Sequence, residues 1–190
     1  TVIDAFFYAF GPYEFARSIQ ALSGQIDVGD TLVSEDALAD AARRAGDTDV
    51  LINRHIHVRD LADERIRSVT APNNDTLYTS AVLELSKTPV CLTLPASGDR
   101  YLSVALMDMF TDQTMVGHAD RGGKGGTYLI VGPDSAQKDG PGVIRMPSND
   151  VWLLARTFVA GVDDLEAARA VQSEIVVEPV DTKVKPRLFT

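Results

Sequence analysis

Apolar residues in the first part of the chain follow the spacing of an α-helix. Between residues 2 and 23 they recur every three or four positions, with Gly11-Pro12 as an interruption. Because proline lacks a backbone donor and has a fixed φ, the pattern predicts two helical pieces with a break at this pair. A second helix is predicted for residues 34–45, since Ser34 can cap its start and Gly46 follows its last apolar position.

The apolar period changes to two in the middle of the chain, which is typical of β-strands. Residues 77–85 alternate, and a turn at 86–89 leads to the run 90–94, so this segment predicts a β-hairpin. The glycine cluster 122–126 lacks the Gly-Lys-Ser/Thr of a phosphate-binding loop and precedes a strand, so we interpret it as a hairpin loop. Further strands are predicted at residues 101–109, 126–131, 143–146 and 151–159.

A last helix is predicted between Asp163-Asp164, which suit its positive end, and Pro179, which stops it. Helices come first, strands follow and one helix closes the pattern. We therefore expect an α+β fold with a helical N-terminal part, an antiparallel β middle and a C-terminal helix. The expected organisation is one domain over residues 1–180, followed by a basic extended tail over residues 181–190.

The composition is that of an ordinary globular domain, with 190 residues, 45% of them hydrophobic and 24% charged. The net charge of −9, without any basic block, argues against nucleic acid as a partner. The single cysteine, Cys91, excludes an internal disulfide and is expected to be a small core residue. No uninterrupted apolar stretch is long enough to span a bilayer.

The most unusual polar stretch holds two histidines and four arginines within residues 54–67. If His55, His57 and Arg59 alternate on a strand, they share one face and form an anion-attracting patch. A solvated face, with Arg59 paired to a neighbouring aspartate, accounts for the same residues equally well. The His-X-His spacing also leaves metal binding open, although no cysteine lies nearby.

A second polar group precedes the strand at residue 77. Asn73, Asn74 and Asp75 exceed what one turn needs, so they are predicted to orient a polar ligand or hold an oxygen-ligated cation. Asp108 falls on the apolar face of its predicted strand, where a carboxylate needs a partner. Arg100 or an arginine of the earlier stretch could supply it, and a purely structural buried pair is the alternative.

Two residues of the last predicted strand, Trp152 and Arg156, are expected to pack across the sheet, with a pocket-lining role as the alternative. No Gly-X-Ser-X-Gly elbow is present, so acyl transfer by a serine nucleophile has no local support.

Several strings of this sequence together resemble one bacterial family, the domain-of-unknown-function family twelve-fifty-four. The resemblance extends over about residues 2–180, and its most specific element is Pro-Asn-Asn-Asp-Thr-Leu-Tyr, followed at the right distance by Arg-Tyr and Met-Asp. The strings are residues 53–61, 72–78, 100–101, 107–111, 126–133 and 151–157.

The resemblance implies an α+β domain with a β-sandwich-like middle. It also implies export to the bacterial envelope or periplasm, with membrane association through a segment upstream of Thr1, and a companion β-rich domain that commonly follows in the same polypeptide. A companion chain or a homo-oligomer is therefore expected. The family brings no assigned reaction, cofactor or metal. Its shared polar residues correspond here to His55, Arg59, Asn73, Asn74, Asp75, Tyr78, Arg100, Tyr101, Asp108, Trp152 and Arg156.

Two classes of function remain open from the sequence. In the first, the protein is a hydrolase or a binder of a small polar or anionic molecule, which Arg59 and Arg100 hold. Asp75 or Asp108 is then the base or cation ligand, and His55 transfers the proton. The remaining predicted ligand-binding residues are Asn73, Asn74, Tyr78, Tyr101 and Arg156.

In the second class, the protein is a non-catalytic module whose polar cluster locks helix to sheet and whose exposed β-edge pairs with a companion chain. An exposed apolar edge strand would favour this module. A concave pocket that holds His55, Arg59, Asp75 and Arg100 with unpaired polar atoms would favour the enzyme.

Overall fold

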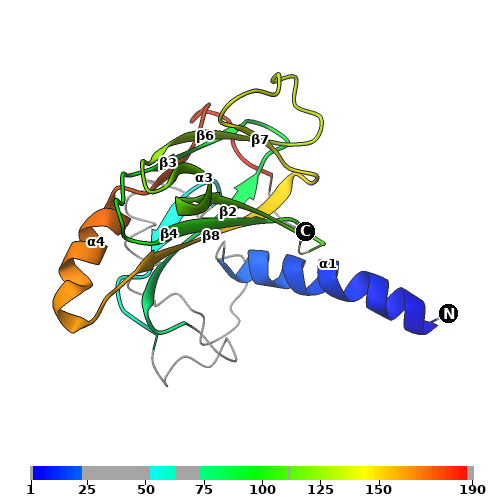
Figure 1. The fold of residues 1–190 in the computed structure, drawn as a ribbon. Coiled ribbons are helices and arrows are strands. Elements are labelled where there is room, and N and C mark those ends of the chain that lie inside the picture. The colour runs from blue at the N-terminus through cyan, green and yellow to red at the C-terminus, as the bar shows by residue number, and fades with distance from the viewer. Residues whose placement is uncertain (1, 23–51, 63–72, 111, 188–190) are drawn as a thin grey trace.

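Two β-sheets face each other in the computed structural model, which describes residues 2–22, 52–62, 73–110 and 112–187 (Figure 1). The five-stranded sheet has the order β1 (His55–His57), β2 (Thr76–Glu84), β8 (Asp150–Phe158), β4 (Leu102–Met107) and β5 (Gln113–Gly117). The four-stranded sheet has the order β7 (Val143–Arg145), β6 (Gly126–Val131), β3 (Val90–Leu94) and β9 (Val176–Pro179). The helices are α1 (Val2–Leu22), α3 (His118–Arg121), the 3-10 turn η1 (Val162–Asp164) and α4 (Leu165–Ser173).

The hydrophobic core lies between the inner faces of the two sheets. Alternate residues of each strand point inward, and the largest of them are completely buried. Removal of this apolar surface from water is the main driving force for the stacking of the sheets. The fully buried members include Leu83, Leu92, Leu106, Ile130 and Leu153.

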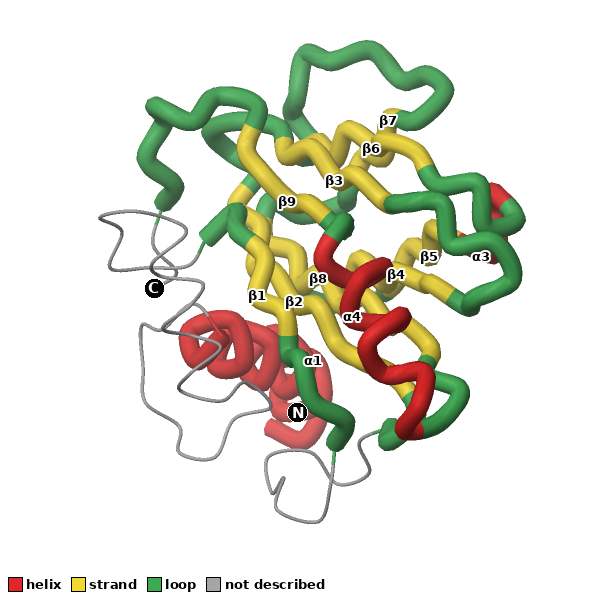
Figure 2. Tube along the Cα trace, turned by 90° about the vertical axis from the view of Figure 1, so that its left-hand side faces the viewer, coloured by secondary structure: helices red, strands yellow, loops and turns green. Residues whose placement is uncertain are grey.

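Two helices contact the five-stranded sheet at different places. Helix α4 adjoins the end of the sandwich, where Ala168 packs with Leu77 and Val159. Helix α1 lies on the outer face of the same sheet, away from the four-stranded sheet (Figures 1 and 2). Phe15 and Ile19, in its second half, are buried there. Among the described helices, none combines the length and the apolar character needed to cross a membrane.

The predicted α+β class is confirmed, including the helical start, the two-sheet middle and the C-terminal helix. Strands β4, β6, β7 and β8 lie where the alternation predicts them, within one or two residues at each end. The pairing is antiparallel throughout the two sheets as described, except between β6 and β7. The predicted helix at residues 34–45 lies outside the described residues.

The predicted break at Gly11-Pro12 is wrong, because α1 continues through Pro12 without interruption. Proline in a helix removes one hydrogen bond, here the one to the carbonyl of Tyr8. Tyr8 is 74% exposed, so water can solvate that carbonyl in place of the missing donor. The cost of the proline is therefore small in this exposed part of the helix.

The predicted hairpin of residues 77–94 is also wrong. Strands β2 and β3 belong to different sheets, and the turn at 86–89 carries the chain from one sheet to the other. The glycine cluster 122–126 makes a similar crossing, since it follows α3 and leads from β5 in one sheet to β6 in the other. Cys91 points away from the core and is half-buried, because β3 turns Leu92 inward instead.

Candidate functional site

The predicted site residues divide between the two ends of the five-stranded sheet. Strands β2 and β4 both run antiparallel to β8, so both begin at the same end of the sheet. Asp75 precedes β2, and Arg100 and Tyr101 precede β4, which brings these three residues to one end. Asp108 follows β4 and lies at the opposite end. The geometry therefore separates Asp108 from Asp75, while His55 lies on β1 opposite Ala81, well inside β2.

Arg100 is committed to an ion pair with Asp164 in η1. Its two terminal nitrogens donate to the two carboxylate oxygens at 2.6 and 2.7 Å. One of them also donates to the carbonyl of Phe158 at 2.6 Å. The hydrogen bond from Arg100 holds the pKa of Asp164 well below its usual range, and the same contact raises the pKa of Arg100. This guanidinium joins β4 to the segment that enters α4.

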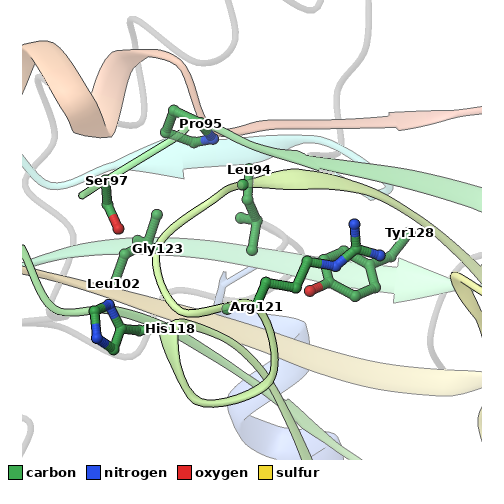
Figure 3. Close-up of a pocket in the computed structure, with 10 residues that line it drawn as sticks. Leu94, Pro95, Ser97, Leu102, His118, Arg121, Gly123 and Tyr128 are labelled. Carbon is green, nitrogen blue, oxygen red and sulfur yellow. The ribbon is translucent and has the colours of Figure 1, made fainter. Parts of the chain in front are cut away.

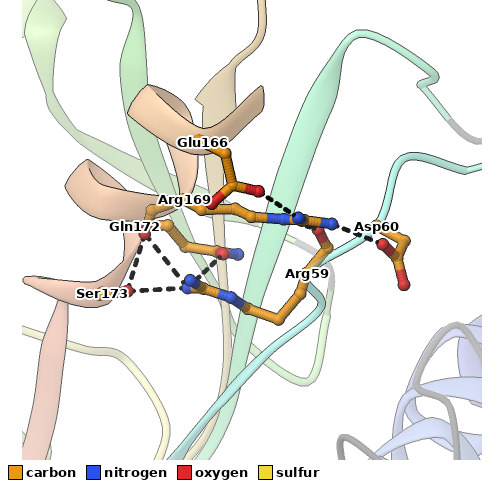
Figure 4. Close-up of polar contacts among 6 residues, drawn as sticks. All are labelled: Arg59, Asp60, Glu166, Arg169, Gln172 and Ser173. Carbon is orange, nitrogen blue, oxygen red and sulfur yellow. Dashed lines mark hydrogen bonds and ion pairs between the residues drawn. The ribbon is translucent and has the colours of Figure 1, made fainter. Parts of the chain in front are cut away.

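Arg59 is equally committed, in this case to the C-terminal part of α4 (Figure 4). Its guanidinium donates to Ser173 Oγ at 2.9 Å, to Gln172 Oε1 at 3.1 Å and to a main-chain carbonyl of α4 at 3.2 Å. Gln172 is fully buried and donates in turn to the carbonyls of Val58 and Tyr78, both at 2.9 Å. These bonds attach the helix to β2 and to the chain that follows β1.

Arg169 completes this network from the side of the helix (Figure 4). Its guanidinium donates to the carbonyl of Arg59 at 2.8 Å, to Asp60 at 2.7 Å and to Glu166 at 2.6 Å. The two carboxylates are largely exposed, so each ion pair adds little on its own. The two arginines nevertheless hold α4 in one orientation.

Of the three residues predicted to share one strand face, His55 and His57 do so, since their ring centroids lie 4.6 Å apart, whereas Arg59 lies beyond the end of β1. His55 Nδ1 accepts a hydrogen bond at 3.1 Å from the amide of Val177 in the four-stranded sheet. His57 Nδ1 lies 2.9 Å from Thr79 Oγ1 on β2. His55 thus links the two sheets at one edge, whereas His57 bonds within its own sheet. Across residues 2–22, 52–62, 73–110 and 112–187, no cluster of His, Cys, Asp and Glu is suited to a metal ion.

The polar residues before β2 form a turn whose hydrogen bonds are made to groups of the same segment. The amide of Asn73 donates to the hydroxyl of Tyr78 at 2.9 Å, and Asn73 Oδ1 accepts from the amide of Asp75 at 3.4 Å. The side chains of Asn73, Asn74 and Asp75 are all exposed. The carboxylate of Asp75 makes no hydrogen bond or ion pair within the described part of the chain. The side chains of this turn are therefore open to solvent.

Asp108 is buried, at 2% exposure, but the predicted arginine partner is wrong. Its Oδ1 instead accepts from the amides of Phe110 at 2.8 Å and Asp112 at 3.0 Å. A carboxylate can close a turn in this way without any cation, because main-chain amides supply the donors. The sequence pattern indicated the need for a partner correctly, but it did not indicate that the backbone provides it.

Arg156 differs from these residues, because it points outward from the middle of the sheet and is not paired. The strand register places it beside Tyr78 on β2 and Ser103 on β4, with Gly117 of β5 next in the same row. Its side chain is half-buried, and its Nε is buried without a hydrogen-bond partner. No carboxylate of the described residues pairs with it. Thr76 Oγ1, on the same face, is buried and unpartnered as well.

Trp152 packs across the sheet as predicted, in contact with the cluster of α1. Its Nε1 donates to Ser80 Oγ on β2 at 2.9 Å. This bond satisfies the indole donor within the sheet face itself. Trp152 therefore has a structural role. Arg156, four residues further along the same strand, makes no comparable contact within the described residues.

A small, shallow cavity opens between the sheets near α3, and the sequence analysis did not identify it (Figure 3). His118 lines it, and the Nδ1 of this ring is buried without a partner. The Arg121 guanidinium carbon lies 4.2 Å from the ring centroid of Tyr128, whose hydroxyl donates to Asp120 at 2.8 Å. Burial, with that bond, raises the pKa of Tyr128. The adjoining glycine cluster was the only signal for this region in the sequence.

Solved structures resemble this fold but carry no stated activity. The VPA0106 protein from Vibrio parahaemolyticus is 19% identical, with a TM-score of 0.65, and the match covers 98% of this chain and 41% of that one. An uncharacterised protein from Burkholderia cenocepacia is 14% identical, with a TM-score of 0.43, over 95% of this chain and 52% of that one. This chain thus spans about half, or less, of the length of either protein.

Comparison with curated proteins finds no match. A family model described as "Protein of unknown function (DUF1254)" matches residues 52–179, which is more than half of the chain. The matched region contains both sheets, α4 and every polar residue discussed above as a candidate for the site. The chain therefore belongs to the DUF1254 family.

Proposed function

We propose that this domain is a non-catalytic interaction module that docks onto a further β-rich domain through the first half of α1. The observation that carries the proposal is an apolar surface that is exposed in the described structure. Large hydrophobic side chains on this half of the helix are between 51% and 87% exposed. They are Val2, Ile3, Phe6, Tyr8, Phe10 and Tyr13.

This surface continues onto the neighbouring edge of the five-stranded sheet. The rings of Tyr8 and Phe110 lie 6.4 Å apart, and Phe110, in the turn between β4 and β5, is 51% exposed. Strand β5 pairs only with β4 within the described sheets, so one of its edges presents unpaired main-chain groups. An exposed edge beside an apolar helix is a surface to which another chain can add.

Charge favours a protein as the occupant over a lipid surface. Asp4 is the only charged residue between Val2 and Tyr13, and the net charge of the chain is −9. Adsorption to anionic membranes relies on lysine and arginine beside the apolar face, which this segment lacks. The Vibrio protein contains a match to this fold within a much longer chain, which supports a further domain as the partner.

The positions of the predicted catalytic residues also favour a non-catalytic role. His55 bonds to the main chain of β9, and Asp108 closes a turn at the far end of the sheet. Arg59 and Arg100, proposed to hold an anion, are both engaged with α4 or η1. The envelope location that the resemblance implies stays a prediction.

The test is co-expression of this chain with the β-rich domain that accompanies it, followed by size-exclusion chromatography with light scattering. We expect the wild-type chain to elute with that domain and the Ile3→Glu/Phe10→Glu variant, at two exposed positions, to elute alone with an unchanged melting temperature. Val162→Glu, at a site 87% exposed in η1, is the matched control and should behave as wild type. Co-elution of the double variant with the β-rich domain would overturn the proposal. It would also be overturned if the wild-type chain formed a homodimer and the double variant were a monomer.

A further inference from the structure

Arg156 is exceptional among the arginines of the described residues. Six of the others lie within 4.0 Å of a carboxylate oxygen: Arg17, Arg100, Arg121, Arg145, Arg169 and Arg187. Arg54 and Arg59 donate to main-chain carbonyls. Arg156 makes no hydrogen bond or ion pair with the residues described, although its Nε is fully buried. A half-buried guanidinium without a counter-ion is costly, because burial removes water and supplies nothing in its place. The position therefore suits an anion that comes from outside the chain.

The residues beside Arg156 in its row of the sheet carry no charge. Tyr78 and Ser103 flank it and are buried, at 7% and 4% exposure. Gly117 ends the row, and its amide donates to Asp120 Oδ1 at 2.6 Å. The nearest acidic residue on this face of β8 is Asp150, six positions away and so about 20 Å distant.

Apolar side chains surround this polar centre on the same face. The next outward row, at the end of the sheet where β2 and β4 begin, contains Tyr101 and Phe158. Their exposed fractions are 44% and 36%. In the row on the other side, Leu154 on β8 is half-buried, Ala105 is buried at 5% exposure, and Met115 at the end of the row is 40% exposed. The strand spacing makes this apolar row about 10 Å long. One cation beside a strip of this length matches a ligand with one anionic head and an apolar body.

We propose that this outer face of the five-stranded sheet binds an amphiphilic monocarboxylate, whose carboxylate pairs with Arg156 while its apolar body extends from Leu154 toward Met115. A carboxylate fits the planar guanidinium with two parallel hydrogen bonds. Inorganic phosphate fits less well, since a multiply charged anion needs several cations and Arg156 is the only lysine or arginine at the outward positions of the described strands of this sheet. The site goes beyond docking through α1 and involves none of the residues of that helix.

Binding is measured by titration calorimetry on the isolated chain with octanoate, octanol, acetate and inorganic phosphate. We expect octanoate to bind at least about tenfold more tightly than the other three probes, because only it has both a charge and an apolar body. Arg156→Gln should weaken octanoate binding at least about tenfold, and Arg156→Lys should restore part of the loss. Arg17→Gln, which removes an exposed arginine on α1, is the matched control.

A second variant protects the test against misfolding of the arginine variants. Met115→Glu places a negative charge at the end of the apolar row on an exposed edge strand, so the fold should persist while octanoate binding is lost. Equal octanoate affinity in wild type and Arg156→Gln overturns the proposal. Acetate or phosphate binding as tight as that of octanoate overturns it too, since the apolar strip would then contribute nothing. The α1 variants leave this titration unchanged, so the two proposals fail separately.

Discussion

Arg100 holds both carboxylate oxygens of Asp164, at 2.6 and 2.7 Å, and so ties the first residues of β4 to the turn that begins α4. The carboxylate also accepts the amide of Ala160 at 2.8 Å, which closes the loop after β8. A planar guanidinium and a carboxylate in this arrangement are strongly directional. The residue that the sequence suggested as an anion-binding group is thus satisfied from within the fold.

Asp164→Asn should lower the melting temperature by a few degrees at neutral pH. The pKa of Asp164 lies well below its ordinary value of 3.8, so its stabilisation is complete above that pH and is lost as the pH falls below it. The difference in melting temperature between wild type and variant should therefore stay constant from pH 7 to about pH 4 and shrink at lower pH. Calorimetric scans across this range measure it. A difference that grows on acidification would contradict this assignment.

Arg187→Gln should destabilise the protein most at neutral pH. Burial raises the pKa of Asp150, Glu84 raises it further and Arg187, which is bonded to Asp150, opposes both. Without the cation the charged carboxylate becomes more costly, and protonation at low pH removes that cost. The loss in melting temperature relative to wild type should therefore diminish as the pH falls through the raised pKa. Lys185→Gln removes the same charge nearby and should show no such dependence.

Asn53→Ala should cost about 1–3 kcal/mol in the free energy of unfolding, because two buried main-chain groups of Glu84 lose their partner. The amide of Asn53 bonds both of them, at 2.8 and 3.0 Å, from a side chain that is 2% exposed. Its φ of 58° adds strain for alanine but not for glycine. Urea unfolding should thus rank Asn53→Gly between wild type and Asn53→Ala. The reverse order would mean that backbone conformation is unimportant here.

Asp75→Asn should leave the melting temperature unchanged, since the Asp75 side chain is exposed and only its main chain is bonded, to Val159 at 2.8 Å. Surface changes of this kind usually alter stability by less than about 0.5 kcal/mol. Thermal denaturation followed by circular dichroism measures the effect. A loss of about 1–3 kcal/mol would place the carboxylate in a buried polar network instead.

The sequence predicted the identity of most elements, because local rules govern them. The alternation in residues 101–109 and 151–159 corresponds to β4 and β8, and the acidic pair at Asp163-Asp164 marks the start of α4. Strands β5 and β9 went unpredicted. Strand β5 is an edge strand with three exposed residues in five, so it has little apolar alternation. Strand β9 is short and ends at the proline that was interpreted only as a helix stop.

The sequence predicted which polar residues are candidates for the site, but it did not predict how they are arranged in space. Alternation put His55 beside His57 correctly, since the period of a strand settles which residues share a face. It could not show that Arg59 reaches Gln172, 113 residues away, or that Arg100 reaches Asp164, 64 residues away. Because of these pairings, Arg59 and Arg100 are already bonded within the fold and are not free to bind a substrate anion. Arg156 became distinctive only because no such partner reaches it within the described structure.

By itself, the sequence determined the α+β class, the positions of most strands and the family, because apolar periodicity and short motifs are local properties of the chain. The tertiary structure decided which strands share a sheet, and it sent β2 and β3 to opposite layers where the sequence suggested a hairpin. It also decided which charges are paired. Sheet assignment and charge pairing depend on contacts between residues far apart in the chain, and no local pattern encodes those contacts.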